Sequence, residues 1–248
     1  MNDVASHLVD AVLPKVAIRQ WVCTLPWQLR YRVGYDRLLC AGVFDAFVKE
    51  LLRSYRRRAK RELGLDSQRG AHTGTVTFIQ RFDSALRLTP HAHTLVLDGV
   101  YVRTSDGPLQ FHALPAPTHA EVSEVARRTA ARIERLLGQR GEQLEQGDSG
   151  YDELADHQPV LAACYRAATA GTQLLGAQPG QPVMRALAPS PRTAASVAAK
   201  LVAEVRGVHV HAERAVDGRD RAQLERLCRY LARPPLSHDR LWLLADGR

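Results

Sequence analysis

The pattern of apolar and polar positions predicts that strands and helices alternate along this chain. Period-two alternation bounded by turn residues is typical of strands, whereas apolar residues three and four positions apart are typical of helices. Strands are predicted at residues 19–25, 75–82, 91–97, 100–102 and 208–216. Helices are predicted at residues 35–61 and 219–232, the second ended by Pro234-Pro235. This order favours an α+β fold, in which an antiparallel sheet is backed by helices.

The Asp98-Gly99 dipeptide gives a more local prediction. Asp-Gly between two apolar runs is typical of a two-residue hairpin turn. We therefore expect residues 100–102 to fold back and pair with the strand at 91–97.

Residues 104–205 differ in composition from the rest of the chain. Prolines punctuate a stretch rich in Ala, Gln and Gly, and helices are predicted at 120–137, 160–170 and 194–205. We interpret this stretch as a mobile, mainly helical insertion. The catalytic domain would then be discontinuous and consist of residues 1–103 and 206–248.

Composition places the chain among ordinary globular proteins, with 45% hydrophobic and 24% charged residues. No apolar run is long enough to cross a bilayer, and the first residues do not form a secretory signal. We therefore expect a cytoplasmic protein without a membrane partner. The four cysteines lie far apart in the sequence, which argues against a zinc ribbon or a disulfide framework.

The positive charge of the chain is concentrated in one segment. The net charge is +8, and residues 19–69 contain twelve Lys or Arg against five Asp or Glu. The densest part is at the end of the predicted helix, where basic side chains either contact phosphates or complement the helix dipole as a solvated surface. The candidate DNA-contacting residues are Arg53, Arg56, Arg57, Arg58, Lys60 and Arg61.

His91-Ala92-His93 is the most distinctive motif. Alternation along a strand places both imidazoles on one face, where they can provide two ligands to a divalent metal. Gln80, on the preceding predicted strand, is a candidate third ligand, although it could equally be an ordinary polar side chain between Phe78 and Phe82.

A second pair of this kind, His209-Val210-His211, leaves the choice of metal ligands open. It also lies on a predicted alternating strand. It could hold the metal instead of the first pair, or His211 could help to complete a site with four histidines. The sequence by itself does not decide between these arrangements.

Tyr230 is the candidate nucleophile. It lies on the flank of the last predicted helix, away from the centre of that helix's apolar stripe, so it can reach along the sheet while the helix stays packed. Arg229 and Arg233 bracket it and could hold a scissile phosphate. The alternative is a boundary tyrosine whose hydroxyl faces water. No motif of a P-loop enzyme, a serine hydrolase or a zinc protease competes with this assignment.

Several blocks of this sequence, including those around His91 and Tyr230, together resemble the transposases of rolling-circle insertion sequences. These transposases form the common-region (ISCR) branch of the HUH (His–hydrophobic–His) endonuclease superfamily. The strongest blocks are Pro90-His-Ala-His-Thr-Leu-Val-Leu-Asp-Gly-Val-Tyr101 and Leu227-Cys-Arg-Tyr-Leu-Ala-Arg-Pro-Pro235. Weaker blocks are residues 19–26, 29–31, 80–82, 207–212 and 240–241. They occur in the family's order and cover about half of the chain.

The resemblance implies a sheet of the Rep/relaxase (ferredoxin-like) type and a metal-dependent DNA-nicking activity. It implies that His91 and His93 bind Mg²⁺ or Mn²⁺ and that Tyr230 attacks a phosphate of single-stranded DNA. The product is a 5′-phosphotyrosyl link and a free 3′-hydroxyl, later resolved by strand transfer. The implied partner is DNA, either single-stranded or at the hairpin ends of an element.

The chain departs from the family pattern in three ways. Some relatives carry an earlier tyrosine on the same helix, where this chain has Arg226, so we expect a single-tyrosine enzyme. A cysteine-rich zinc-binding segment and a C-terminal extension, both found in longer members, are not present in this sequence. The alternatives are therefore a truncated, inactive remnant that binds DNA, or an unrelated metal hydrolase built on the histidine pairs.

Overall fold

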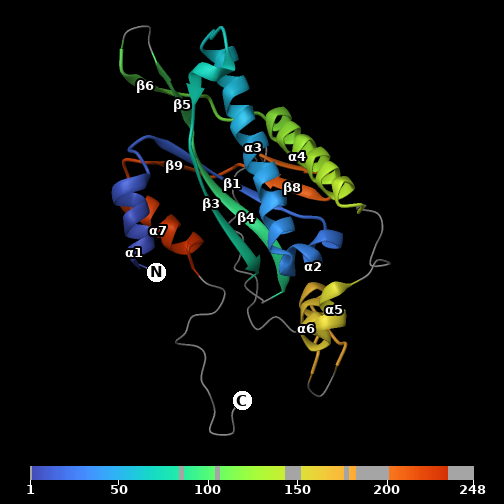
Figure 1. The fold of residues 1–248 in the computed structure, drawn as a ribbon. Coiled ribbons are helices and arrows are strands. Elements are labelled where there is room, and N and C mark those ends of the chain that lie inside the picture. Colours follow the sequence, from blue (N-terminus) through green and yellow to red (C-terminus); the bar gives the residue numbers. More distant parts are fainter. Residues whose placement is uncertain are drawn as a thin grey trace.

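The fold was obtained as a computed structural model that describes residues 2–83, 87–103, 107–142, 152–175, 179–182 and 201–233. Within this part of the chain, every pair of neighbouring strands is antiparallel. The main sheet has the order β3-β4-β1-β8-β7, with β9 also pairing with β1, and a smaller sheet has the order β2-β5-β6. The predicted α+β class with an antiparallel sheet backed by helices is confirmed (Figure 1).

The bounds of the elements follow the chain. The strands are β1 (Ala17–Thr24), β2 (Ala71–His72), β3 (Thr75–Phe82), β4 (Leu88–Leu97), β5 (Gly99–Arg103), β6 (Leu109–Ala113), β7 (Val202–Val205), β8 (Val208–His211) and β9 (Ala215–Asp217). The α-helices are α1 (Asn2–His7), α2 (Trp27–Tyr35), α3 (Arg37–Glu62), α4 (His119–Gln139), α5 (Glu153–His157), α6 (Pro159–Ala170) and α7 (Arg221–Leu231). A π-helical turn, η1 (Leu8–Val12), and a 3₁₀ turn, η2 (Gln68–Gly70), complete the set.

Helices cover both faces of the main sheet (Figure 1). On one face, Trp21 of β1 and Ala92 of β4 belong to a core shared with α3 and α4. On the other face, Ile18 and Leu95 belong to a second core shared with α1 and α7. Because successive side chains of a strand point to opposite faces, β1 and β4 contribute alternate residues to the two cores.

The prediction of a hairpin at Asp98-Gly99 is wrong. β5 pairs with β2 and β6 in the smaller sheet, and not with β4. The carboxylate of Asp98 is buried, where it accepts from Arg19 Nη2 at 2.7 Å and from the Tyr55 hydroxyl at 3.0 Å. These contacts fix Asp98 at the point where the chain leaves β4 of the main sheet and enters β5 of the smaller sheet. Gly99 serves a close approach, because a Cβ there would lie 2.3 Å from the carbonyl oxygen of His112.

Two other predicted elements also differ. The strand expected at 208–216 is divided into β8 and β9, which both pair with β1. The prediction of a helix at 194–205 is wrong for its last residues, because Val202–Val205 forms the strand β7. Residues 194–200 lie outside the described part of the chain. β7 and β8 are joined through Arg206 and Gly207, whose φ values of 51° and 74° are those of a tight hairpin turn.

The remaining predicted elements are found close to their predicted bounds. β1, β3 and β4 match the strands predicted at 19–25, 75–82 and 91–97, while α3 and α7 match the two predicted helices. Pro234-Pro235 lies outside the described residues. None of the described helices combines the length and the apolar character needed to cross a membrane.

The segment 104–205 contributes to the core of the main sheet. Its longest helix, α4, begins with a capping box between Thr118 and Glu121 and buries Val122, Val125 and Ile133 in the core shared with α3. Its last strand, β7, extends the main sheet. The division of the chain at 104–205 stays a prediction.

Candidate functional site

One face of β4 carries both histidines of the predicted pair. Cross-strand register places His91 opposite Gln80 of β3 and Thr24 of β1, and His93 opposite Phe78 and Val22. Leu95, which follows on the same face, packs in the core beneath α7. The two imidazoles therefore lie on the face that α7 covers.

The two rings are adjacent, with centroids 5.0 Å apart. Nδ1 of His91 lies 2.6 Å from the carbonyl oxygen of Thr89, an acceptor, so this nitrogen carries the proton and Nε2 keeps its lone pair. Nδ1 of His93 lies 2.9 Å from Nε2 of Gln20, and rotation of this amide by 180° would turn its oxygen toward the ring. Both rings can then offer Nε2 to a metal while Nδ1 donates to a partner, as ligating histidines do. The donor set therefore fits a divalent cation.

Burial keeps His93 in the form that binds metals. The side chain is 8% exposed. Burial lowers the pKa of His93 to about 4, and the neighbouring His91 adds to this effect. Its imidazole is consequently neutral near pH 7, and its lone pair is free for coordination.

Gln20 is a site residue that the sequence analysis did not identify. It lies on β1 opposite Leu95, in a strand that is mostly buried, and is itself 8% exposed. The signal was a glutamine directly before the apolar residues 21–23 of a predicted strand, because a buried amide needs a hydrogen-bonding partner. Only the register of β1 against β4 shows that this partner is His93.

Tyr230 lies beside the histidine pair. On α7, Leu224, Leu227 and Leu231 are buried against the sheet, whereas Tyr230 on the flank is 56% exposed. Its ring centroid is 6.3 Å from that of His93, at an interplanar angle of 77°. An accessible phenol and two imidazoles, far apart in the sequence, thus meet at one end of the sheet.

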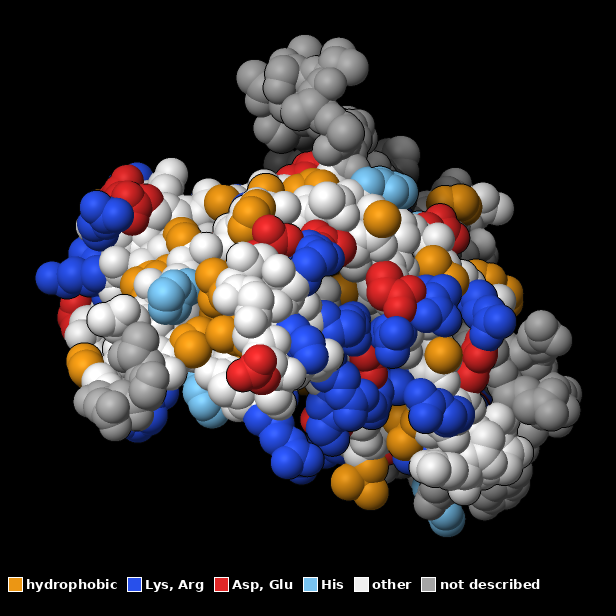
Figure 2. All heavy atoms as spheres, turned by 90° about the horizontal axis from the view of Figure 1, so that it is seen from above, with side chains coloured by type: hydrophobic (Ala, Val, Ile, Leu, Met, Phe, Trp, Pro, Cys, Tyr) orange, Lys and Arg blue, Asp and Glu red, His pale blue; other side chains and the backbone are white. Residues whose placement is uncertain are grey.

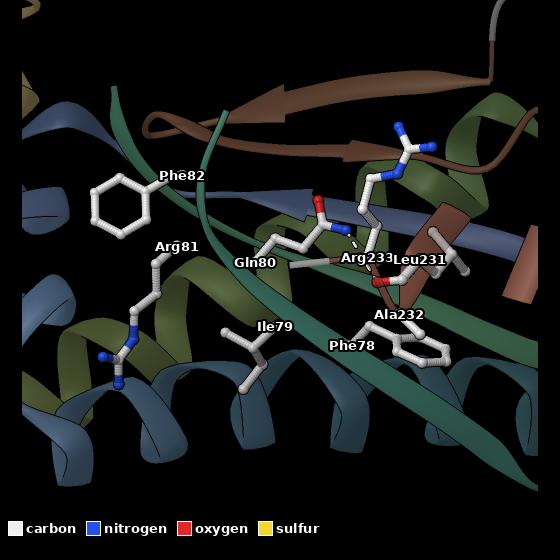
Figure 3. Close-up of a pocket in the computed structure, with 8 residues that line it drawn as sticks. All are labelled: Phe78, Ile79, Gln80, Arg81, Phe82, Leu231, Ala232 and Arg233. Atoms are coloured by element: carbon white, nitrogen blue, oxygen red, sulfur yellow. Dashed lines mark hydrogen bonds between the residues drawn. The ribbon is translucent and has the colours of Figure 1, made fainter. Parts of the chain in front are cut away.

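Gln80 joins the edge strand to the end of α7. Its Nε2 donates to the carbonyl oxygen of Leu231 at 3.0 Å. Gln80 points toward this helix end, whereas Ile79 and Arg81 point to the other side of β3 (Figure 3). A pocket of about 400 Å³ opens here, with Phe78, Phe82 and Arg233 among its lining residues.

The second histidine pair is separated from the first. His209 and His211 of β8 lie opposite Thr24 and Val22, so β1 stands between the two pairs. His209 is 3.5 Å from the carboxylate of Glu204. Within the part of the chain that the structure describes, no three His, Cys, Asp or Glu side chains converge as a metal site. The arrangement favours separate roles for the two pairs over a site with four histidines.

The two arginines that bracket Tyr230 differ in their partners. Arg229 donates through Nε and Nη2 to Glu225, one turn earlier on α7. Arg233 is exposed, and no ion pair engages its guanidinium among the described residues. Arg233 is therefore the arginine better placed to receive a phosphate.

The predicted basic cluster lies on the opposite side of the sheet from Tyr230. It belongs to α3, whose buried face packs in the core on the other side of β4. Arg58 is 3% exposed, donates to the carbonyl of Pro115 and pairs with Glu121, so we assign it a structural role and withdraw it as a DNA contact.

The other members of this cluster, Arg53, Arg56, Arg57, Lys60 and Arg61, remain candidates. They are exposed or half-buried. The pKa of Arg57 is lowered by burial and then by the nearby Arg128 of α4, whereas Glu50 and Glu124 oppose this shift. The face in Figure 2 carries a dense group of Lys and Arg side chains with fewer acidic ones among them.

Comparison with known proteins gives one match. A family model described as "Putative transposase" (Y2_Tnp) matches residues 74–248, which is more than half of the chain. The matched region includes β4 with its histidines and α7 with Tyr230. No curated protein and no solved structure matches the chain.

Proposed function

Because this chain belongs to the Y2_Tnp family of transposases, we propose that it nicks single-stranded DNA with Tyr230 as the nucleophile and then transfers the cut strand. One contact supports this mechanism above all. The ring of Tyr230 lies 6.3 Å from that of His93, on the sheet face that also carries His91. A nucleophile and two imidazoles therefore face the same space.

The nicking step exchanges one phosphodiester for another. Oη of Tyr230 attacks the phosphorus, and the bond from phosphorus to the 3′-oxygen breaks. The tyrosine loses its proton and the departing 3′-oxygen gains one, so the products are a 5′-phosphotyrosine and a free 3′-hydroxyl. In strand transfer, a 3′-hydroxyl attacks the phosphotyrosine and releases Tyr230.

His91 and His93 hold the cation that this reaction requires. The chemistry that Mg²⁺ or Mn²⁺ supplies when bound there is polarisation of the phosphoryl oxygen and neutralisation of developing charge. The chain's own contribution is to orient the two rings, through Thr89 and Gln20. Gln80 is the proposed third ligand, since its Oε1 remains available while Nε2 donates to Leu231.

Arg233 positions the scissile phosphate in this proposal. It follows Tyr230 by less than one helical turn and is exposed beside the pocket at the end of α7. A guanidinium offers paired donors that match two phosphate oxygens. The remaining basic side chains of α3 would contact DNA on the far side of the sheet, which suits single-stranded or hairpin DNA that wraps around the molecule.

The experiment is a covalent-adduct assay with single-stranded oligonucleotides of randomised sequence and Mn²⁺. A 3′ label should stay with the protein on a denaturing gel, whereas a 5′ label should be released with the 3′-hydroxyl fragment. Tyr230→Phe should abolish the adduct, and Tyr165→Phe, a half-buried tyrosine on α6, should not. Binding without any adduct would favour a DNA-binding remnant. An adduct that persists in Tyr230→Phe would show that the nucleophile is another residue.

A further inference from the structure

An exposed tryptophan lines a second pocket, which lies at the β7–β8 end of the main sheet, away from the edge strand β3. Trp27 is the first residue of α2 and is 67% exposed. It lines a pocket of about 260 Å³ together with Arg30, Arg206 and His209, among others. An exposed indole offers a large, flat apolar face on which a planar ligand can stack.

This pocket is continuous with the row of residues that contains His91. Register pairs His91 with Thr24, Thr24 with His209, and His209 with Glu204, so the row runs across β4, β1, β8 and β7. Two strand spacings of about 4.8 Å place the His209 backbone about 10 Å from that of His91. A single strand held at His91 would reach this pocket within a short run of nucleotides.

The walls of the pocket are fixed by the fold. Gly207, in the turn between β7 and β8, lies so close to Pro26 that a Cβ there would be 2.6 Å from the proline Cβ. This contact holds the turn against the start of α2, where Trp27 projects. A preformed pocket loses little conformational entropy when it binds a ligand.

The charges around Trp27 favour an anionic partner. Nε of Arg30 donates to the carbonyl of Leu25 at 3.2 Å, and no ion pair engages the guanidinium among the described residues. The pKa of Arg30 is lowered by burial and then by the nearby Arg87, whereas Asp83, which is paired with Arg87, opposes this shift. Arg206 is 63% exposed and pairs with Glu134 outside the pocket lining. The acidic group of the lining, Glu204, faces His209.

We propose that this pocket binds an unpaired nucleobase of the DNA strand, which stacks on Trp27 while Arg30 contacts an adjacent phosphate. This inference rests on the proposed function, since it places the base on the strand that Tyr230 cuts. Bases of a duplex are stacked on one another, so only unpaired nucleotides offer a free face to an indole. Stacking tolerates any base, so the pocket adds affinity for single strands with little sequence preference.

The test is binding of a fluorescent oligothymidylate, measured by anisotropy without divalent metal so that cleavage does not interfere. Trp27→Ala should weaken binding about tenfold, which is within the range measured for the loss of one base-aromatic stack. Trp27→Phe should retain most of the affinity. Leu109→Ala, which removes another exposed apolar side chain on the distant β6, should have no effect.

Three outcomes would overturn the proposal. The first is that the unaltered protein does not bind oligothymidylate, and the second is that Trp27→Ala binds it unchanged. The third is that Trp27→Ala loses as much affinity for the same strand annealed to its complement as for the single strand. The adduct assay separates this inference from the proposed function. Trp27-dependent binding without any adduct would leave the pocket standing and reject the nicking mechanism. Adduct formation with unchanged binding in Trp27→Ala would do the reverse.

Discussion

Gln80 donates a hydrogen bond to the carbonyl of Leu231, the residue that follows Tyr230. The last carbonyls of a helix have no partner within the helix, and this bond occupies one of them. It ties the end of α7 to the edge strand of the sheet. Gln80 is thus both a support for the tyrosine and, through its oxygen, the proposed third metal ligand.

Replacing Gln80 separates these two roles. Gln80→Glu keeps an oxygen that can bind a metal but loses the donor to Leu231, whereas Gln80→Ala loses both. If ligation dominates, Gln80→Glu should retain Mn²⁺ binding, measured by titration calorimetry, and Gln80→Ala should bind Mn²⁺ about 10- to 100-fold more weakly. If support of the helix dominates, both variants should form adduct slowly at saturating Mn²⁺. Wild-type behaviour of Gln80→Ala in both assays would remove Gln80 from the site.

The buried His93 predicts a pH-dependent stability in the metal-free protein. Its pKa is about 4 in the folded state against 6.5 for an ordinary histidine, chiefly because of burial. Between these values the unfolded chain binds a proton that the folded chain does not, so stability is complete above pH 6.5 and falls as the pH drops toward 4. At 1.36 kcal/mol per pH unit the loss approaches about 3 kcal/mol.

Urea unfolding at several pH values, with a chelator present, measures this slope. Carboxylates also titrate near the lower end of this range, so the informative quantity is the difference between the protein and His93→Asn. The variant should lose less stability between pH 6.5 and pH 4.5. Equal slopes for the two proteins would mean that His93 is solvated and free to charge.

Periodicity was sufficient to predict which residues share a face of one element. It placed His91 and His93 together on a strand and Tyr230 on the flank of a helix, because these relations depend only on spacing along the chain. It could not predict which elements pack together. The partner of His93, Gln20, and the position of α3 behind the sheet both depend on register and on layer order.

Where a tertiary contact overrode local sequence, the prediction failed. Asp98-Gly99 has the composition of a hairpin turn, yet Asp98 is held in a buried ion pair with Arg19 and the chain passes into a second sheet. Such a pair joins residues that are distant in the sequence, so no local pattern reveals it. The same holds for β7, whose strand form depends on pairing with β8.

Arg229 and Arg233 should respond differently to removal. Arg229 is already paired with Glu225, so Arg229→Ala should change adduct formation by less than about threefold, as expected for an exposed ion pair. Arg233→Ala should slow it by about tenfold or more, because a charge-assisted contact to phosphate is worth roughly 1.5–3 kcal/mol. Single-turnover rates at saturating DNA measure the difference. The reverse order would indicate that Arg229 leaves Glu225 when DNA binds.

The position of α3 opposite Tyr230 predicts that its basic side chains affect binding and not chemistry. Replacing both Arg56 and Arg57 by Ala should lower the slope of log affinity against log salt by about 1.4, since each phosphate contact to a single strand contributes about 0.7. The rate of adduct formation at saturating DNA should stay unchanged, because these residues lie across the sheet from the reacting groups. Arg127→Ala is the matched control on α4, where the arginine is already paired with Glu124. A lower rate at saturating DNA in the Arg56 and Arg57 variant would place the cleaved strand on the α3 side of the sheet and contradict the site described above.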